Sequence, residues 1–289
     1  MNTFIELLQQ PFVQNALMAG TLIAIVAAII GYFVILRAQA FAAHALSHVG
    51  FAGATLSALL GISGLLGMMG FTITAGLGMG ALGKRIHGRD VEIGMILSFF
   101  LGLGVLFLRL YTNSSSETVS VLFGSILSVT PMNIILTLFF GVTTLIVLTA
   151  IFRPLLFSSI DPEVAEARGV PTKILSIIFI LLLAITVAES IQVVGVLLVF
   201  ALLVAPAAAA QHLTRKPFSA IVISVIFGIA FTWGGMLLAL TTSYPVSFYI
   251  AVLAAITYMI ALKIGHYIHP HSRIEPEHAG RECSVRVMK

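Results

Sequence analysis

The chain contains few charged residues. Of its 289 residues only 9% are Asp, Glu, Lys or Arg, and 59% are hydrophobic, whereas about a quarter of an ordinary soluble domain is charged. A water-soluble fold of this composition would leave a large apolar surface in water. The composition therefore indicates a protein that lies in lipid. A run of about 20 apolar residues is long enough to cross a hydrocarbon core of about 30 Å.

Cysteine is almost absent as well. The single Cys283 excludes an internal disulfide framework and any metal site built from several cysteines. The first twelve residues contain Glu6 but no Lys or Arg, so they lack the basic start of a cleavable signal peptide. The sequence also has no Gly-x-x-x-x-Gly-Lys-Ser/Thr phosphate loop, and we therefore expect no ATP hydrolysis by this chain alone.

Long apolar runs are the main feature that is present. They predict membrane spans at about 15–36, 40–60, 64–83, 91–111, 132–152, 173–188, 192–210, 218–240 and 246–265. The count is eight or nine, because 173–188 and 192–210 are short and only Glu189–Ile191 separates them. The fold class expected is all-α, a polytopic membrane helical bundle, with a transmembrane domain over 1–265 and a flexible cytoplasmic tail over 266–289.

Basic residues are unevenly distributed between the two ends of these spans. With an external N-terminus and nine crossings, Lys and Arg gather on one side, and the opposite connections around Asn113–Glu117, Glu189 and Thr241–Ser247 lack them; Arg109 is the exception. Cytoplasmic loops are the ones enriched in Lys and Arg, which sets the orientation. Topology thus explains the net charge of +4, and no nucleic-acid partner is expected.

Two histidines lie four residues apart in the second predicted span. His44 and His48 share one helical face inside an apolar run, where both imidazoles can reach one metal ion. Ionisable side chains within a span are costly and usually face a cavity or a partner, and imidazole suits zinc better than magnesium or calcium. We interpret the pair as a metal site. The alternative is that both rings only form hydrogen bonds to neighbouring helices.

The same spacing also occurs in zinc proteases, which place a Glu directly after the first histidine as general base. Here Ala45 occupies that position. A membrane metalloenzyme that uses His44 and His48 is therefore the weaker interpretation. A sensor or structural membrane subunit is a further alternative for the whole chain.

A short charged helix is predicted in the cytoplasmic loop after the fifth span. Asp161 can cap this helix, Pro162 can take its first position and Gly169 can end it. The segment also holds the charged residues Glu163, Glu166 and Arg168. Such a shape fits either a docking element for a cytoplasmic partner or an ordinary solvated connector.

Imidazoles and one thiol recur in the tail. The residues are His266, His269, His271, His278 and Cys283. They could bind zinc weakly or sense its cytoplasmic level. The polar, Pro-containing composition of the tail favours disorder without any metal.

Four segments together resemble the permease subunits of the zinc, manganese and iron ABC importer family. They are Phe41–Gly50, Leu122–Leu127, Asp161–Gly169 and Val194–Ala208. The resemblance implies a multi-pass permease of the bacterial inner membrane that imports a divalent metal ion, holds no permanent cofactor, and leaves ATP hydrolysis to a separate ATPase subunit. It also implies a second permease copy as a homodimer partner and an extracytoplasmic metal-binding protein that delivers the cargo.

The resemblance assigns roles to two of these segments. Asp161–Gly169 looks like the coupling helix that fits a groove on the ATPase, with Glu163 and Glu166 as contact residues. Family permeases commonly present Asp-x-x-x-His in the second span, and here His44 stands in place of the carboxylate while His48 matches. Carboxylate suits manganese and imidazole suits zinc, so we expect zinc as cargo, with manganese next. Iron or a chelated metal is the alternative.

Overall fold

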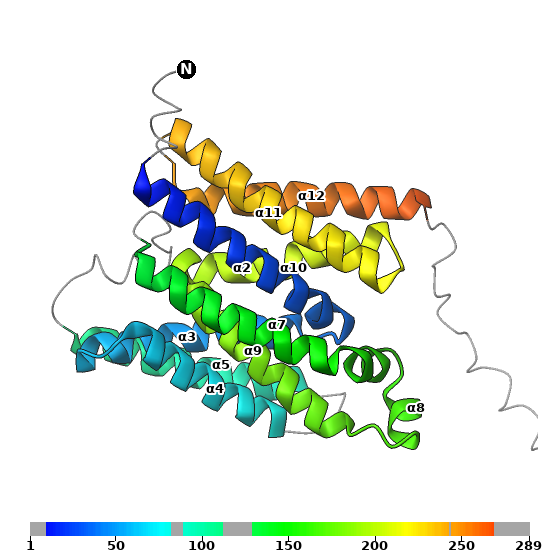
Figure 1. Cartoon of the computed structure of the whole chain (residues 1–289). Helices are drawn as coiled ribbons and strands as arrows, with labels where there is room; N and C mark the ends of the chain where they lie inside the picture. Colours follow the sequence, from blue (N-terminus) through cyan, green and yellow to red (C-terminus); the bar gives the residue numbers. More distant parts are fainter. Residues whose placement is uncertain (1–9, 82–88, 112–128, 243, 269–289) are drawn as a thin grey trace, which may run out of the picture.

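A computed structural model of the chain describes residues 10–81, 89–111, 129–242 and 244–268. Within these residues the secondary structure is helical and no strand is present. The helices in chain order are α2 (Pro11–Leu36), α3 (Ala40–Leu60), α4 (Gly64–Ala81), α5 (Arg89–Leu110), α7 (Pro131–Ile160), α8 (Pro162–Ala167), α9 (Thr172–Val194), α10 (Val196–Leu213), α11 (Pro217–Thr241) and α12 (Val246–Ile268) (Figure 1).

Helix lengths agree with a membrane bundle. In the part of the chain that is described, eight helices are long and apolar enough to span a bilayer, and α4 supplies a further, shorter apolar helix. The outer helices α5 and α12 expose large apolar side chains, among them Phe99, Val105, Ile256 and Met259. An apolar surface of this kind suits lipid rather than water. The predicted fold class, an all-α polytopic bundle with eight or nine spans, is confirmed.

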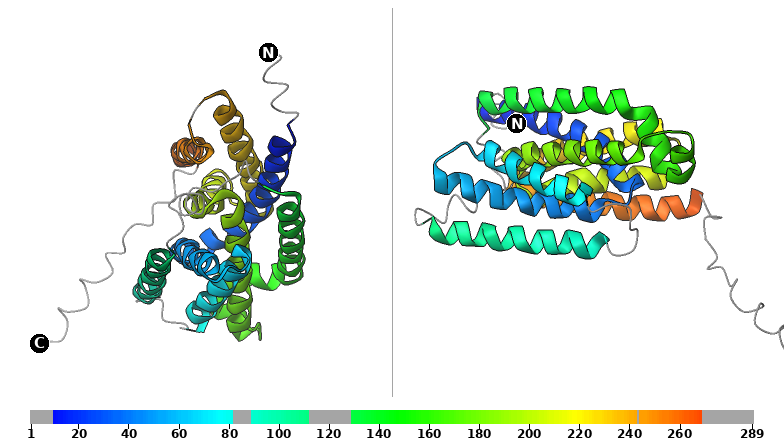
Figure 2. Two further views of the ribbon diagram at one scale, coloured as in Figure 1. Left: turned by 90° about the vertical axis from the view of Figure 1, so that its left-hand side faces the viewer. Right: turned by 90° about the horizontal axis from the view of Figure 1, so that it is seen from below.

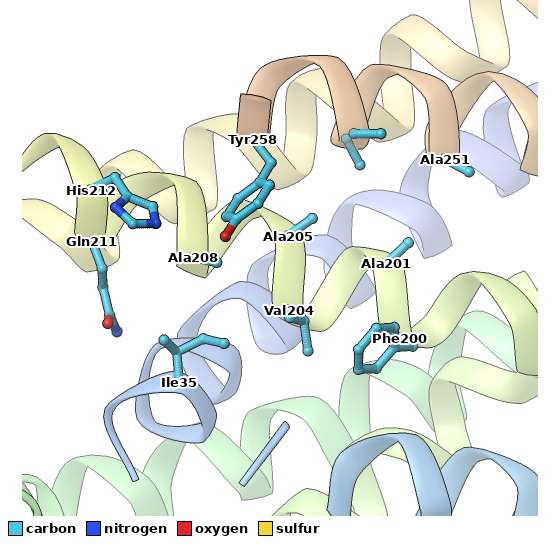
Figure 3. Close-up of a pocket in the computed structure, with 12 residues that line it drawn as sticks. Ile35, Phe200, Ala201, Val204, Ala205, Ala208, Gln211, His212, Ala251 and Tyr258 are labelled. Atoms are coloured by element: carbon cyan, nitrogen blue, oxygen red, sulfur yellow. The ribbon is translucent and has the colours of Figure 1, made fainter. Parts of the chain in front are cut away.

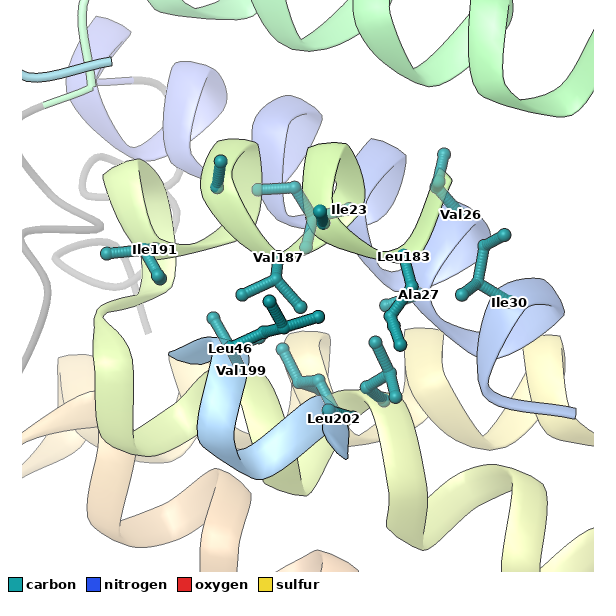
Figure 4. Packing of buried hydrophobic residues seen from close by; sticks show 14 of the residues in the cluster. Ile23, Val26, Ala27, Ile30, Leu46, Leu183, Val187, Ile191, Val199 and Leu202 are labelled. Atoms are coloured by element: carbon teal, nitrogen blue, oxygen red, sulfur yellow. The ribbon is translucent and has the colours of Figure 1, made fainter. Parts of the chain in front are cut away.

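The long helices lie side by side, with α9 in the interior of the bundle (Figure 2). Helix α9 packs against α2, α3, α4, α7 and α10. Figure 4 shows Leu46 of α3 close to Val187 of α9 and Val199 of α10, and these three side chains are no more than 1% exposed. The core therefore joins the histidine-bearing helix to the centre of the bundle.

One end of the bundle collects the connections predicted to be cytoplasmic. Figure 1 shows α8, the connection from α10 to α11 and the end of α12 at the same end, opposite the start of α2. That end carries basic residues of these connections, including Arg168, Arg215, Lys216 and Lys263. The arrangement agrees with the orientation expected from the distribution of Lys and Arg.

Two predicted boundaries were wrong. The fifth span was expected to end near residue 152, but α7 continues through Pro154 to Ile160. Glu189 was expected in an external connection, yet it lies inside α9 and is 1% exposed. The break between the two helices falls instead at Gly195, which adopts φ 84° and ψ 161°. Residues other than glycine rarely adopt that conformation, whereas Glu189–Ile191 contain no residue that would end a helix.

Candidate metal site and coupling segment

The two histidines of α3 lie together as the spacing predicts. Helix α3 begins at Ala40, so His44 and His48 occupy successive turns of the same face. Their ring centroids are 4.7 Å apart and the rings meet edge to face at 83°. Both side chains are partly buried, and the neighbouring Ala43 and Ala45 are buried. The shared face is confirmed, and the pair can present two ring nitrogens to one ion.

The pair alone is an incomplete coordination shell. Structural zinc sites use four protein ligands and catalytic ones three. Among the described residues no group of three or more His, Cys, Asp or Glu side chains is close enough to hold a metal ion. The described part of the chain therefore offers two imidazoles to an ion at this position.

A phenylalanine of another helix fixes one side of His44. The ring of Phe200 in α10 lies 5.1 Å from the His44 ring, centroid to centroid, at an angle of 72°. Aromatic pairs of this geometry contribute about 0.5–1.5 kcal/mol. Phe200 was not predicted from the sequence as a site residue, because α10 reads as a uniformly apolar span.

A groove between α10 and α12 begins at the same phenylalanine. Its volume is about 610 Å³, and Figure 3 shows Phe200 at one end with Gln211 and His212 at the other. Between them small side chains face the groove, namely Ala201, Ala205 and Ala208 of α10 and Ala251, Ala254 and Ala255 of α12. These small side chains allow α10 and α12 to pack closely as well as to line the groove.

A second hollow continues the groove towards the basic end of the bundle. It measures about 670 Å³ and shares Gln211 and His212 with the first. Arg215, Lys263 and His266 are among its other lining residues. His266 is the one tail residue of the predicted set within the described chain, and it is exposed. His269, His271, His278 and Cys283 lie outside the described residues, so metal binding by the tail stays a prediction.

The short charged helix forms where the capping residues predict it. The backbone N–H of Val164 donates to Asp161 Oδ1 at 3.0 Å, and Pro162 takes the first helical position of α8. Gly169 ends the turn with φ 82°. Ala165 is 0% exposed and anchors the helix to the bundle.

The charged side chains of this segment are exposed at the surface of the bundle. Glu163, Glu166 and Arg168 are all exposed, and the Arg168 guanidinium carbon lies 5.8 Å from the centroid of the Phe157 ring. Helix α8 projects from the end of the bundle (Figure 1). An apolar residue thus holds the segment in place, and its charged residues are exposed.

Glu189 is a buried carboxyl that was not predicted. It faces Gly141 of α7, and its Oε1 would lie 3.8 Å from a Cβ placed on that glycine. Neither carboxylate oxygen has a hydrogen-bond partner among the described residues. One turn along α9, Gln192 donates to Asn133 Oδ1 at 3.3 Å. The i, i+3 spacing of Glu189 and Gln192 was the available signal, because it places both on the face that meets α7.

The chain is similar in sequence to a known family of transport proteins. Residues 9–265 match the ABC 3 transport family. The chain is 34% identical over 263 residues to the manganese import system permease protein ScaB of Streptococcus parasanguinis, covering 90% of this chain and 94% of the relative. It is 34% identical over 227 residues to the manganese transport system membrane protein MntC of Listeria monocytogenes, with 78% and 81% covered.

A zinc relative and a solved structure are also similar. The high-affinity zinc uptake system membrane protein ZnuB of Haemophilus influenzae is 28% identical over 228 residues, which cover 78% of this chain and 86% of that protein. The structure of PsaBC from Streptococcus pneumoniae in complex with Fab matches with a TM-score of 0.81 and 30% identity, over 90% of this chain and 94% of that one.

Proposed function

This chain belongs to the ABC 3 transport family, and on that premise we propose that it carries zinc, and manganese less well, into the cytoplasm. It is a multi-pass permease of a metal ABC importer in the bacterial inner membrane. It serves as a transport component, and ATP hydrolysis takes place on a separate ATPase subunit.

The His44–His48 pair is the observation that carries the choice of cargo. Both donors are nitrogens, and no third metal-binding side chain joins them among the described residues. Imidazole suits zinc, whereas carboxylate, carbonyl and water suit manganese. Relatives named for manganese and a relative named for zinc both align with this chain, so the donor set is a better guide to the cargo than the relatives' names.

The groove beside the histidines gives the ion a route inward. It runs from Phe200, next to His44, towards Gln211 and His212 at the end where α8 lies. The alanines between these points provide no side-chain ligand, and Tyr258 contributes one hydroxyl. An ion that leaves the histidines therefore meets only this weak donor among the lining residues before Gln211 and His212, which favours release.

Three partners complete the transporter in this proposal. An ATPase subunit docks on α8, where Asp161, Pro162 and Gly169 shape the segment and Glu163, Glu166 and Arg168 are exposed. A second copy of the permease forms the transport pathway together with this chain. An extracytoplasmic binding protein delivers the metal at the opposite end, and no permanent cofactor is required.

The test is ATP-dependent metal uptake into lipid vesicles that hold this chain with its ATPase and its binding protein. At equal concentrations of the two ions we expect zinc to enter faster than manganese, and a His44→Ala/His48→Ala double variant to import neither. Faster entry of manganese would overturn the order of cargo. Uptake of only iron or a chelated metal would overturn zinc and manganese as cargo altogether.

A matched control uses the serine between the two histidines. Ser47 is buried, and its hydroxyl donates to the carbonyl of Ala43 at 3.1 Å, within its own helix. Ser47→Ala should therefore retain uptake. If Ser47→Ala were as inactive as the double histidine variant, the loss would reflect damage to α3 rather than loss of metal ligands.

A further inference from the structure

We propose that Arg37 is a positioning residue that links the ATPase-docking segment α8 to the metal-binding helix α3. The inference rests on the proposed function, because it concerns how movement at α8 reaches the histidines. Arg37 is partly buried and follows the last residue of α2. In the sequence it counted only as one of the basic residues that set the orientation.

The guanidinium of Arg37 holds both helices that flank α8. Its Nη1 donates to Ser159 Oγ at 3.1 Å, and its Nη2 donates to Ser176 Oγ at 2.6 Å. Ser159 belongs to the last turn of α7 and Ser176 to the second turn of α9. The segment between these serines contains α8, so one side chain clamps the two sides of the docking segment.

Each serine has the hydrogen-bonding capacity for this role. Ser159 Oγ donates its hydrogen to the carbonyl of Leu155, and Ser176 Oγ donates to the carbonyl of Thr172. A hydroxyl has one donor and two acceptor lone pairs, so each oxygen remains able to accept from Arg37. The planar guanidinium presents fixed, divergent donors, which a lysine ammonium does not reproduce.

An aromatic ring of α9 also holds the Arg37 guanidinium in place. The guanidinium carbon of Arg37 lies 5.6 Å from the centroid of Phe179. That ring is 0% exposed and packs against Phe33 of α2 at 6.1 Å, centroid to centroid. A cation over an aromatic face is attracted by the ring electrons. Arg37 is thereby held over α9 as well as bound to it.

The backbone after Arg37 forms a hydrogen-bonded corner between α2 and α3, in which the N–H of Ala43 donates to the carbonyl of Gln39 at 3.0 Å. The N–H of Ala38 donates to the carbonyl of Ile35 at 3.0 Å, and the N–H of Gln39 donates to that of Val34 at 2.8 Å. Ala38 has φ 52°, a left-handed conformation uncommon for a residue with a side chain. Helix α3 starts at Ala40, and His44 follows one turn later. A displacement of Arg37 is therefore transmitted through a fixed corner to the histidine face.

Arg37 could instead act only as a cytoplasmic anchor that sets topology, in the manner of many basic residues at the ends of spans. The two roles differ in what they require. An anchor needs the positive charge, whereas the link needs the two serine acceptors and the forked guanidinium. Variants that preserve the charge but remove the bridge therefore separate them.

The test uses the complete transporter in vesicles and measures metal ions imported per ATP hydrolysed. In Ser159→Ala/Ser176→Ala and in Arg37→Lys we expect this ratio to fall by about fivefold or more, the lower end of typical coupling between sites, with ATPase activity and melting temperature retained. Ser158→Ala is the matched control, because Ser158 Oγ donates to the carbonyl of Leu155 and not to the clamp. It should keep the wild-type ratio.

Three outcomes decide the matter. A ratio that falls in the two clamp variants but not in Ser158→Ala supports the link. An unchanged ratio in the clamp variants, or a parallel loss of uptake, ATPase activity and folded protein, overturns it and leaves Arg37 as a structural anchor. Absence of zinc and manganese uptake by the wild type would instead refute the proposed function on which the link rests.

Discussion

Exchanging His44 for aspartate tests the proposed metal preference most directly. His44→Asp keeps one imidazole at His48 and replaces the other nitrogen donor by a carboxylate oxygen. Since carboxylate suits manganese and imidazole suits zinc, we expect the variant to gain manganese transport relative to zinc. The change affects one of only two metal-binding side chains that the described residues of one subunit bring together here.

The expected change in the ratio of zinc to manganese uptake is large because His44 is one of two ligands. Changes to groups that merely orient a metal ligand alter affinity by about 10- to 100-fold, and exchange of the ligand itself should do no less. Since no third His, Cys, Asp or Glu of the described residues joins the pair to compensate, the ratio of zinc to manganese uptake should fall about tenfold or more. The edge contact between His44 and Phe200 is also lost, at a cost of about 0.5–1.5 kcal/mol.

The assay is competitive uptake of the two metals into vesicles with the complete transporter, and His44→Leu is the control. Leucine is close to aspartate in size and loses the same ring contact with Phe200 but offers no donor atom. It should lower zinc uptake without raising manganese uptake. An unchanged metal ratio in His44→Asp, or the same ratio in both variants, would refute the assignment of metal selection to the donor atom at this position.

Three further predictions concern other parts of the fold. Gly195→Ala should lower the melting temperature, because φ 84° and ψ 161° cost a residue with a side chain about 1–3 kcal/mol; Gly102→Ala, where a Cβ meets no atom within 4 Å, should not. Asp161→Ala removes the N-cap of α8, which contributes about 0.5–2 kcal/mol to helix stability, and should weaken metal-stimulated ATPase activity. Asp161→Asn keeps a capping side chain and should retain this activity; equal ATPase activity in the two variants would show that the cap is dispensable. Glu189→Gln should preserve uptake and stability, because neither carboxylate oxygen has a hydrogen-bond partner within the described part of the chain. Loss of uptake in a folded variant would show that the carboxyl itself binds a proton or cation.

Local signals were sufficient for a large part of the architecture. The apolar runs predicted the spans because a helix that crosses lipid needs a minimum length of apolar side chains. The capping residues Asp161, Pro162 and Gly169 predicted α8, since each acts on the backbone within a few residues of its own position. The common face of His44 and His48 followed from helical periodicity alone.

Local signals failed at Glu189, where only the surrounding helices decide between a loop and a continuous helix. Glu189 was expected in an external loop because a lone carboxylate within a span is unfavourable. The helix nevertheless continues past it, and the break occurs at Gly195, where the backbone conformation demands glycine. The residues around Glu189 would be the same whether its carboxyl lay in a loop or against Gly141 of α7, so the sequence could not distinguish the two.

The sequence by itself therefore determined the membrane class, the number of spans within one, the short charged helix and the common face of the two histidines. Tertiary structure alone decided that Phe200 meets His44 and that a groove begins at Phe200. It also decided that Arg37 binds Ser159 and Ser176, which lie 122 and 139 residues further along the chain. The physical reason is that periodicity and capping act over one or two helical turns. Contacts between distant helices depend on how whole apolar surfaces pack, and side chains such as Phe200 and Arg37 acquire their roles only there.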